Sequence, residues 1–324
     1  MKTRCLVYIT LLLVFFLMLA GCRRDQGQQQ AGATATHTPT PFSTALPAVP
    51  TVVPPGSETN ALQMVIYSDA PSAGTSAATR LEDALREEGL NVQVLIRARY
   101  AEVLAALCNS GSGQVAVAWL DGITYAAARA QNCGAPVLLV ERDDEIGEAV
   151  EIVVNQDIQT DNIIALRDGA YCRLSYNDFQ TWLAPVLVFS ASGLNPVGAF
   201  ETITDYEDIP TLLQAVADGD CDITSIAAGT LNDTDFATLL DNIRVIETSV
   251  AFPYNILMIP IEVPLDIRIQ LINALESIAR DRTLANSMRA LLGQEALVPM
   301  ENDTLDEFHE FIDNTGLDFA QLGS

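Results

Sequence analysis

The fold class is decided by the stretch VAVAWLDGITYAAARA, residues 115–130. Residues 115–120 form an uninterrupted apolar run, which is typical of a strand buried on both faces. Residues 123–130 are predicted to be helical, and Asp121 is placed to cap that helix. A buried strand that passes directly into a helix favours an α/β fold with parallel strands and right-handed crossovers.

The same alternation extends in both directions from this stretch. On its two sides the sequence predicts strands at 64–68, 92–96, 137–140 and 151–155, and helices at 72–88 and 101–108. A second series follows, with strands at 171–174, 222–226 and 243–246 and helices at 178–190, 209–217 and 231–240. A strand at 255–259 and one or two helices over 265–292 complete the chain.

Two such series indicate two α/β lobes joined by two crossing segments. We assign residues 62–150 and 255–324 to the first lobe and residues 151–254 to the second. A two-lobed molecule of this kind places a ligand cleft between its lobes.

The N-terminus has the features of an export signal. Lys2 and Arg4 precede an apolar run over residues 5–20, which is short for a membrane span. The run ends in Leu-Ala-Gly-Cys at 19–22, which resembles the lipobox of bacterial lipoproteins. The resemblance implies that residues 1–22 contain a signal peptide and that Cys22 becomes a lipidated N-terminus. The alternative is an uncleaved anchor helix, and either reading places the rest of the chain outside the cytoplasm.

Residues 23–61 are predicted to be a disordered tether. They are rich in Gln, Thr, Ala and Pro, and they lack a sustained apolar period. Such a segment reaches between roughly 35 Å as a coil and 120 Å as polyproline II, which is enough to hold a domain clear of a bilayer.

Composition excludes several classes of function. The chain has 17 basic and 42 acidic residues and a net charge of −25, so we exclude nucleic acid as a partner. Lys2 is the only lysine, which removes Schiff-base catalysis from a processed chain. The two histidines are His37, in the tether, and His309, which we expect to be a solvated helix residue.

These two histidines supply neither a hydrolase base nor a zinc cluster. No spacing singles out a catalytic carboxylate pair of the glycosidase kind. We therefore expect no enzymatic activity, no cofactor and no metal.

Four cysteines remain after Cys5 in the signal and Cys22 at the lipidation site. Three pairings are possible, and export favours the oxidised state. Cys108 ends the helix before the 115–120 strand and Cys133 ends the helix after it, so both lie at one sheet edge. Cys172 and Cys221 each open a strand of the second series. We predict the pairs Cys108–Cys133 and Cys172–Cys221, each within one lobe.

Several segments together resemble one family. They are Ala-Arg-Tyr-Ala-Glu-Val at 98–103, the stretch at 115–125, Cys-Arg-Leu-Ser-Tyr-Asn-Asp-Phe-Gln-Thr-Trp-Leu-Ala-Pro at 172–185, Asp-Gly-Asp-Cys-Asp at 218–222 and residues 264–279. Over residues 62–300 the chain resembles the phosphate, phosphite and phosphonate substrate-binding proteins of ABC importers, which have the type II periplasmic binding fold. The resemblance implies a small-molecule solute and a membrane permease as partners.

The resemblance also implies where the ligand binds. The candidate ligand-binding residues are Tyr100, Asp121, Tyr125, Ser175, Asp178, Gln180, Thr181 and Trp182. The family's Ser-Thr-Ser-Gly, which cradles the oxyanion at a helix N-terminus, is replaced here by Asp-Phe-Gln-Thr at 178–181. The family's Gly-Pro is replaced in this chain by Asp-Gly at 121–122, and the family's Ser-His is replaced by Asp-Ile at 208–209. A carboxylate in the anion nest repels a phosphonate, so we expect no tight binding of phosphate or phosphonate.

Two interpretations of the altered pocket follow. In one, its carboxylates and aromatic rings bind a different solute that carries an amine or an aromatic ring. In the other, Asp121 and Asp178 only cap helices, Trp182 is core, and the pocket has lost its ligand.

The function we predict is a lipid-anchored, extracytoplasmic solute-binding component of an ABC importer. The alternative is a sensor or scaffold lipoprotein of the same fold without a role in transport, and a hydrolytic or pyrimidine-processing enzyme ranks last.

Overall fold

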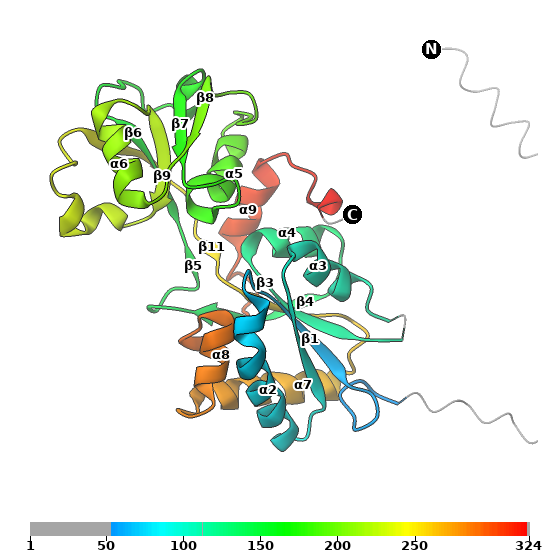
Figure 1. The fold of residues 1–324 in the computed structure, drawn as a ribbon. Helices are drawn as coiled ribbons and strands as arrows, with labels where there is room; N and C mark the ends of the chain where they lie inside the picture. The colour runs from blue at the N-terminus through cyan, green and yellow to red at the C-terminus, as the bar shows by residue number, and fades with distance from the viewer. Residues whose placement is uncertain (1–52, 112, 323–324) are drawn as a thin grey trace, which may run out of the picture. The chain divides into compact units, whose positions relative to one another are not determined.

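The protein is described by a computed structural model covering residues 53–111 and 113–322 (Figure 1). The predicted signal peptide, Cys22 and the tether up to residue 52 lie outside the described residues. The last residues of the predicted tether form turns, in which the Gly56 N–H donates to the Asn60 carbonyl. Asn91 attaches these turns to the first sheet, donating from its backbone N–H to the Gly56 carbonyl and from its side chain to the Ser57 carbonyl.

The predicted α/β class is confirmed by the first of two large sheets, which has six strands. Its spatial order is β13-β4-β12-β3-β1-β2. The strands are β1 (Leu62–Tyr67), β2 (Val92–Arg97), β3 (Ala116–Leu120), β4 (Ala135–Glu141), β12 (Ile256–Ile259) and β13 (Ala296–Pro299). Strand β1 pairs in parallel with β2 and β3, whereas β12 is antiparallel to β3 and β4. The sheet is therefore mixed: the expected parallel pairing is confirmed for β1, β2 and β3, whereas it is wrong for β12, β4 and β13, which pair antiparallel.

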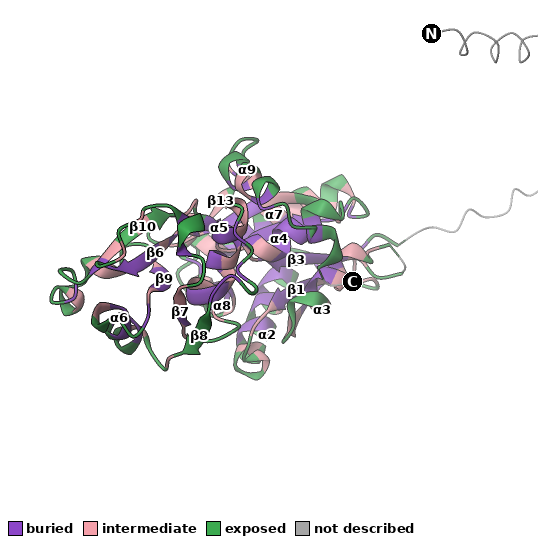
Figure 2. Ribbon diagram, turned by 90° about the horizontal axis from the view of Figure 1, so that it is seen from above, coloured by how far each residue is buried: buried purple, intermediate pink, exposed green. Residues whose placement is uncertain are grey.

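The central strand β3 is buried on both faces, as its apolar run predicts. Ala116, Ala118 and Leu120 face α3 (Tyr100–Cys108) and α4 (Gly122–Ala130). Val117 and Trp119 face the opposite layer, in which α2 (Pro71–Glu87), α7 (Leu265–Arg280) and α8 (Ala285–Leu292) pack. Figure 1 shows these helices on the two sides of the sheet, and Figure 2 shows the strands β1 and β3 as buried.

The second sheet has five strands in the order β10-β6-β9-β7-β8. They are β6 (Val150–Asn155), β7 (Ala170–Arg173), β8 (Thr202–Asp205), β9 (Ile223–Ala227) and β10 (Ile243–Thr248). Helix α6 (Ile209–Asp218) covers one face. The other face is covered by the π-helix η2 (Phe179–Leu183) and α5 (Ala184–Ala191), with the 3-10 helix η1 (Ile163–Leu166) nearby.

The helix predicted at 231–240 is absent. The segment forms two 3-10 turns, η3 (Thr230–Asn232) and η4 (Thr234–Phe236), because Asp233 Oδ1 accepts a hydrogen bond from the Asp235 N–H. A short polar side chain that bonds its neighbouring backbone competes with helix formation.

Two connecting segments, residues 142–149 and 249–255, join the sheets. Their short strands β5 (Gly147–Glu148) and β11 (Phe252–Pro253) pair antiparallel. A Cβ at Gly147 would lie 2.5 Å from the Phe252 carbonyl oxygen, so only glycine permits this approach. The division into two lobes stays a prediction.

The C-terminal segment packs against both sheet-bearing parts. Helix α9 (Asp306–Asn314) lies against α5, and the 3-10 helix η5 (Phe319–Gln321) lies against α4. One apolar cluster therefore runs from α3 and α4, through Phe252 and α9, to α5.

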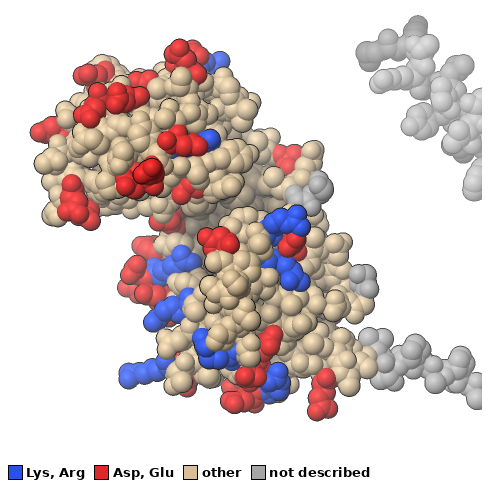
Figure 3. Space-filling view, in the orientation of Figure 1, with Lys and Arg blue, Asp and Glu red and all other residues tan. Residues whose placement is uncertain are grey.

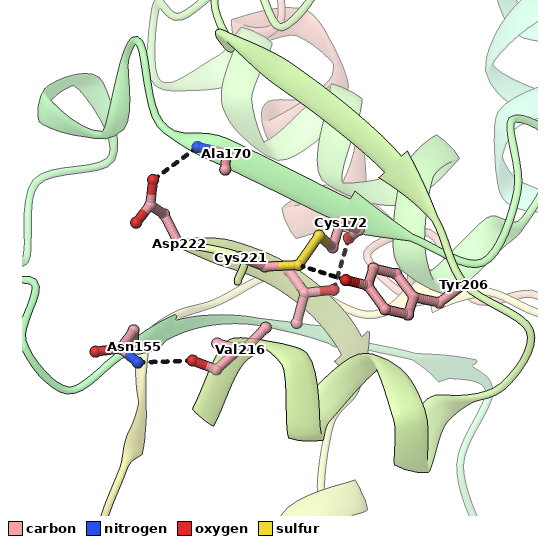
Figure 4. The surroundings of a disulfide bond; sticks show 8 residues. Asn155, Ala170, Cys172, Tyr206, Val216, Cys221 and Asp222 are labelled. Carbon is pink, nitrogen blue, oxygen red and sulfur yellow. Dashed lines mark hydrogen bonds between the residues drawn. A yellow bond between two sulfur atoms is a disulfide. The ribbon is translucent and has the colours of Figure 1, made fainter. Parts of the chain in front are cut away.

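Both predicted disulfides are present, between Cys108 and Cys133 and between Cys172 and Cys221. Figure 4 shows the second, which links β7 to Cys221, two residues before β9 begins. Next to it the Asp222 carboxylate accepts a hydrogen bond from the Ala170 N–H, at 2.7 Å. The disulfide and this bond therefore tie the starts of the two strands together.

Charge is distributed unevenly over the face shown in Figure 3, where arginines gather on the part built on the first sheet and acidic side chains dominate the other part. Within the described ranges, no helix combines the length and apolar character that a bilayer crossing requires.

Candidate functional site

A cavity of about 410 Å³ lies where α3 and α4, the connecting segments and η2 meet. A volume of this size suits one small organic molecule. Its walls are mainly apolar, and its charged lining residues are Asp121, Arg142 and Glu148. The cavity thus has a few polar groups on an apolar surface, which is the usual pattern of a small-molecule site.

Tyr100 forms one wall at the start of α3. Its ring stacks on Tyr67, at the end of β1, with centroids 3.7 Å apart and an interplanar angle of 19°. Burial raises the pKa of Tyr100, and the nearby Asp121 and Tyr67 raise it further. The phenol is therefore neutral at physiological pH and presents an aromatic surface within electrostatic reach of Asp121.

Asp121 caps α4 and also lines the cavity. Its Oδ1 accepts a hydrogen bond from the Thr124 N–H at 2.8 Å, and its Oδ2 accepts one from the Thr124 hydroxyl at 3.1 Å. Burial nevertheless raises the pKa of Asp121, because these bonds only partly offset the loss of hydration. A cation beside this carboxylate would stabilise its ionised form.

The connecting segments contribute Arg142, Glu148 and Tyr254. The Arg142 guanidinium lies 4.2 Å from the centre of the Tyr254 ring, and its Nη2 donates to the Leu292 carbonyl at 2.7 Å. Glu148 Oε1 accepts a hydrogen bond from Gln180 Nε2 at 2.9 Å. This last bond joins a connecting segment to η2, across the edge of the cavity.

Aromatic rings line part of the cavity and continue behind it. Phe179 of η2 meets Phe252 of β11 edge to face, with centroids 5.4 Å apart. Behind Phe252 lie Phe308 and Phe311 of α9, at 5.8 and 5.5 Å. The cavity wall, a connecting segment and α9 therefore share one aromatic cluster.

Helix α9 is fastened to α4 by two polar contacts. The Tyr125 hydroxyl lies 2.8 Å from His309 Nε2, and Arg129 forms an ion pair with Asp313 at 3.0 Å. His309 is half-buried, so the expectation of a solvated residue was wrong. Burial lowers the pKa of His309, and the Arg129 charge adds to this effect.

The structure places the eight predicted binding residues in different surroundings. Tyr100 and Asp121 line the cavity, and Gln180 reaches its edge through Glu148. Tyr125 is buried and directed at α9, while Ser175 is exposed and is not among the lining residues.

The remaining three form a local network at η2. Asp178 Oδ1 accepts hydrogen bonds from the N–H and the hydroxyl of Thr181, at 2.7 and 2.6 Å. Thr181 is fully buried. Trp182 packs edge to face against Tyr171, and the Arg173 guanidinium lies 4.5 Å from its ring centre. Asp178 thus occupies the helix terminus that an oxyanion would need.

Sequence reasoning missed the contribution of the connecting segments. Arg142, Glu148, Phe252 and Tyr254 line the cavity although they lie outside the predicted helices and strands. Their place at the site follows from the crossing of two segments about a hundred positions apart, which no local pattern reports. Among residues 53–111 and 113–322, no cluster of His, Cys, Asp and Glu could hold a metal ion.

Comparisons with known proteins agree with this architecture. Residues 65–305 match the family model described as "ABC transporter, phosphonate, periplasmic substrate-binding protein". No curated protein matches the chain in sequence.

Among solved structures, the chain is similar to the protein XAC2383 from Xanthomonas citri bound to ATP, with a TM-score of 0.59 and 12% identity over 81% of this chain and 98% of that one. It is also similar to a binding protein component of an ABC phosphonate transporter from Pseudomonas aeruginosa, with a TM-score of 0.51 and 15% identity over 79% and 86%. A third is Mh-p37 from Mycoplasma hyorhinis, a putative thiamine pyrophosphate transporter, with a TM-score of 0.53 and 9% identity over 78% and 98%. At these identities the likeness shows the type II periplasmic binding fold alone.

Proposed function

Because the chain belongs to the family of phosphonate periplasmic substrate-binding proteins of ABC transporters, we propose that it is a lipid-anchored importer subunit that captures a small solute other than a phosphonate. The family is one of solute-binding proteins, and a membrane permease is the partner that this membership implies.

The observation that carries the change of ligand is the hydrogen bonding of Asp178. A phosphonate held at the start of η2 would need the backbone N–H groups there, and Asp178 already accepts from the Thr181 N–H. A phosphonate placed about 4 Å from a carboxylate would also meet a repulsion of roughly 4 kcal/mol at an effective dielectric of 20.

The solute-binding role itself is supported by the position of the cavity. Its lining comes from the helices of the first sheet, from both connecting segments and from η2 of the second sheet. A solute bound there contacts every part that must move if the two sheet-bearing parts close around it. Calorimetric titration of the full chain, solubilised in a nonionic detergent, with phosphate and methylphosphonate tests the ligand change. We expect no binding at millimolar concentrations, and micromolar affinity for either anion would refute it.

Lipid anchoring at Cys22 is supported by the sequence at 19–22. Replacing Cys22 by Ala should abolish labelling by a radioactive fatty acid and release the protein from the membrane fraction. The matched control is Cys5→Ala, within the apolar run of the signal, which should leave labelling and anchoring unchanged. Equal labelling of both variants would contradict the proposal.

Crosslinking in intact cells distinguishes import from sensing. Recovery of a polytopic permease together with its ATPase supports an importer subunit. Recovery of a receptor kinase supports the sensor alternative instead.

A further inference from the structure

The cavity holds two carboxylates whose charge the surrounding protein leaves unpaired. Within the described residues, neither Asp121 nor Glu148 forms an ion pair. The hydrogen bonds that they accept come from neutral groups, those of Thr124 to Asp121 and of Gln180 to Glu148. Both carboxylates are partly buried, so the lack of a cationic partner costs free energy, and a bound cation reduces that cost.

The one cationic side chain that lines the cavity has protein partners for only part of its guanidinium. Arg142 stacks on Tyr254 and its Nη2 donates to the Leu292 carbonyl, while its buried Nε has no hydrogen-bond partner among the described residues. The formal charge of the lining is nevertheless negative, with two carboxylates against one guanidinium.

Aromatic and aliphatic surface supplies the rest of the lining. Phe179 and Phe252 meet edge to face, and Tyr100 stacks on Tyr67. Aromatic faces attract cations, and the apolar lining can bury a hydrocarbon or a ring. The lining thus combines carboxylates with apolar surface, which favours an amphipathic cation.

We propose that this cavity binds an organic cation, an amine or quaternary ammonium with an apolar or aromatic body, whose charge lies between Asp121, Glu148 and the Tyr100 ring. This inference rests on the proposed solute-binding function and names its substrate class.

Calorimetry on the full chain in a nonionic detergent tests the class with probes that differ mainly in charge. The cations are phenethylamine, phenyltrimethylammonium and thiamine; the neutral probe is 2-phenylethanol; the anions are 3-phenylpropanoate and methylphosphonate. We expect at least one cation to bind with a dissociation constant below about 100 μM. The neutral and anionic probes should bind at least about 30-fold more weakly, the cost of losing one desolvated charge pair.

A matched pair of variants locates the charge that is recognised. Asp121→Asn keeps a side chain that caps α4 but removes its charge, and it should weaken binding of the cation about 30-fold or more. Asp208→Asn is the control, because Asp208 caps α6 in the same way, accepting from the Thr211 N–H at 2.8 Å, and does not line the cavity. Circular dichroism of both variants shows that the fold is kept.

The outcomes test the proposed substrate class separately from the proposed solute-binding function. Binding of 3-phenylpropanoate or methylphosphonate but of no cation overturns the class and leaves solute binding standing. Equal affinities of the wild type and Asp121→Asn for a cation overturn the placement of its charge beside Asp121. If no probe binds below about 1 mM, the cation class is refuted, and the solute-binding function fails only if, in addition, no small molecule co-purifies with the chain.

Discussion

The Cys172–Cys221 disulfide offers a quantitative test of whether the two proposed lobes unfold independently. The bond closes a loop with a sequence separation of 49 residues, for which the loss of chain entropy in the unfolded state corresponds to about 4 kcal/mol. Replacing both cysteines by Ala should lower the free energy of unfolding of the second sheet by this amount. With a urea slope of about 2 kcal/mol/M, the midpoint falls by about 2 M.

The chain provides its own reporters for this measurement. It has two tryptophans, Trp119 in β3 of the first sheet and Trp182 in η2 beside the second. Both are buried, so the fluorescence of each follows the unfolding of its own surroundings. Replacing either one by Phe gives a full chain with a single reporter.

If the two proposed lobes unfold separately, loss of the second-sheet disulfide should shift the Trp182 transition by about 2 M and leave the Trp119 transition within about 0.3 M of its original midpoint. The reciprocal control removes Cys108–Cys133, whose separation of 25 residues corresponds to about 3.5 kcal/mol and should shift the Trp119 transition. Equal shifts of both reporters in both variants would refute two independent lobes and indicate one cooperative unit.

Two further predictions concern the chemistry of single groups. In the native protein, a mild thiol reductant should reduce the Cys108–Cys133 disulfide before the Cys172–Cys221 disulfide. Both Cys108 and Cys133 are half-buried and line a second cavity of about 360 Å³, so the reductant can reach them. Mass-spectrometric mapping of the alkylated thiols measures the order of reduction, and the opposite order would contradict the prediction. His309→Gln should flatten the pH dependence of stability just below pH 6.5. The folded-state pKa of His309 is lowered, so the unfolded chain takes up the proton first and the free energy of unfolding decreases as pH falls from about 6.5 towards the folded-state value. Urea unfolding at pH 7 and pH 5 that shows the same change for variant and wild type would exclude the effect.

The predictable part of the fold follows from long periodic segments. Residues 92–96 and 123–130 were predicted within two residues of β2 and α4, because hydrophobic pattern and local caps agree there. Strands β5 and β11 were missed, since two-residue strands that pair across the connecting segments carry no periodicity. The helix predicted at 231–240 failed because its short polar residues bond to their own backbone.

The residues of the candidate site likewise fall into those that the sequence identifies and those that only the structure brings together. Tyr100 and Asp121 were identifiable through the family resemblance of the segments at 98–103 and 115–125, and each lies where a helix begins after a strand. The Tyr125–His309 contact joins positions 184 apart, and the Gln180–Glu148 bond spans 32, so neither leaves a local signal. The sequence supplied the chemistry of individual helix starts, and only the crossing of the connecting segments determines which side chains share the cavity.

The most direct test of the central claim is identification of the solute that the protein carries. The full chain would be purified from its own cells without denaturation, its small molecules released by heating, and their identities established by mass spectrometry. We predict one organic molecule, positively charged at pH 7, that is enriched with the wild type, retained by Asp208→Asn and lost from Asp121→Asn. A phosphonate among the enriched solutes, or an identical set released from all three proteins, would contradict the account.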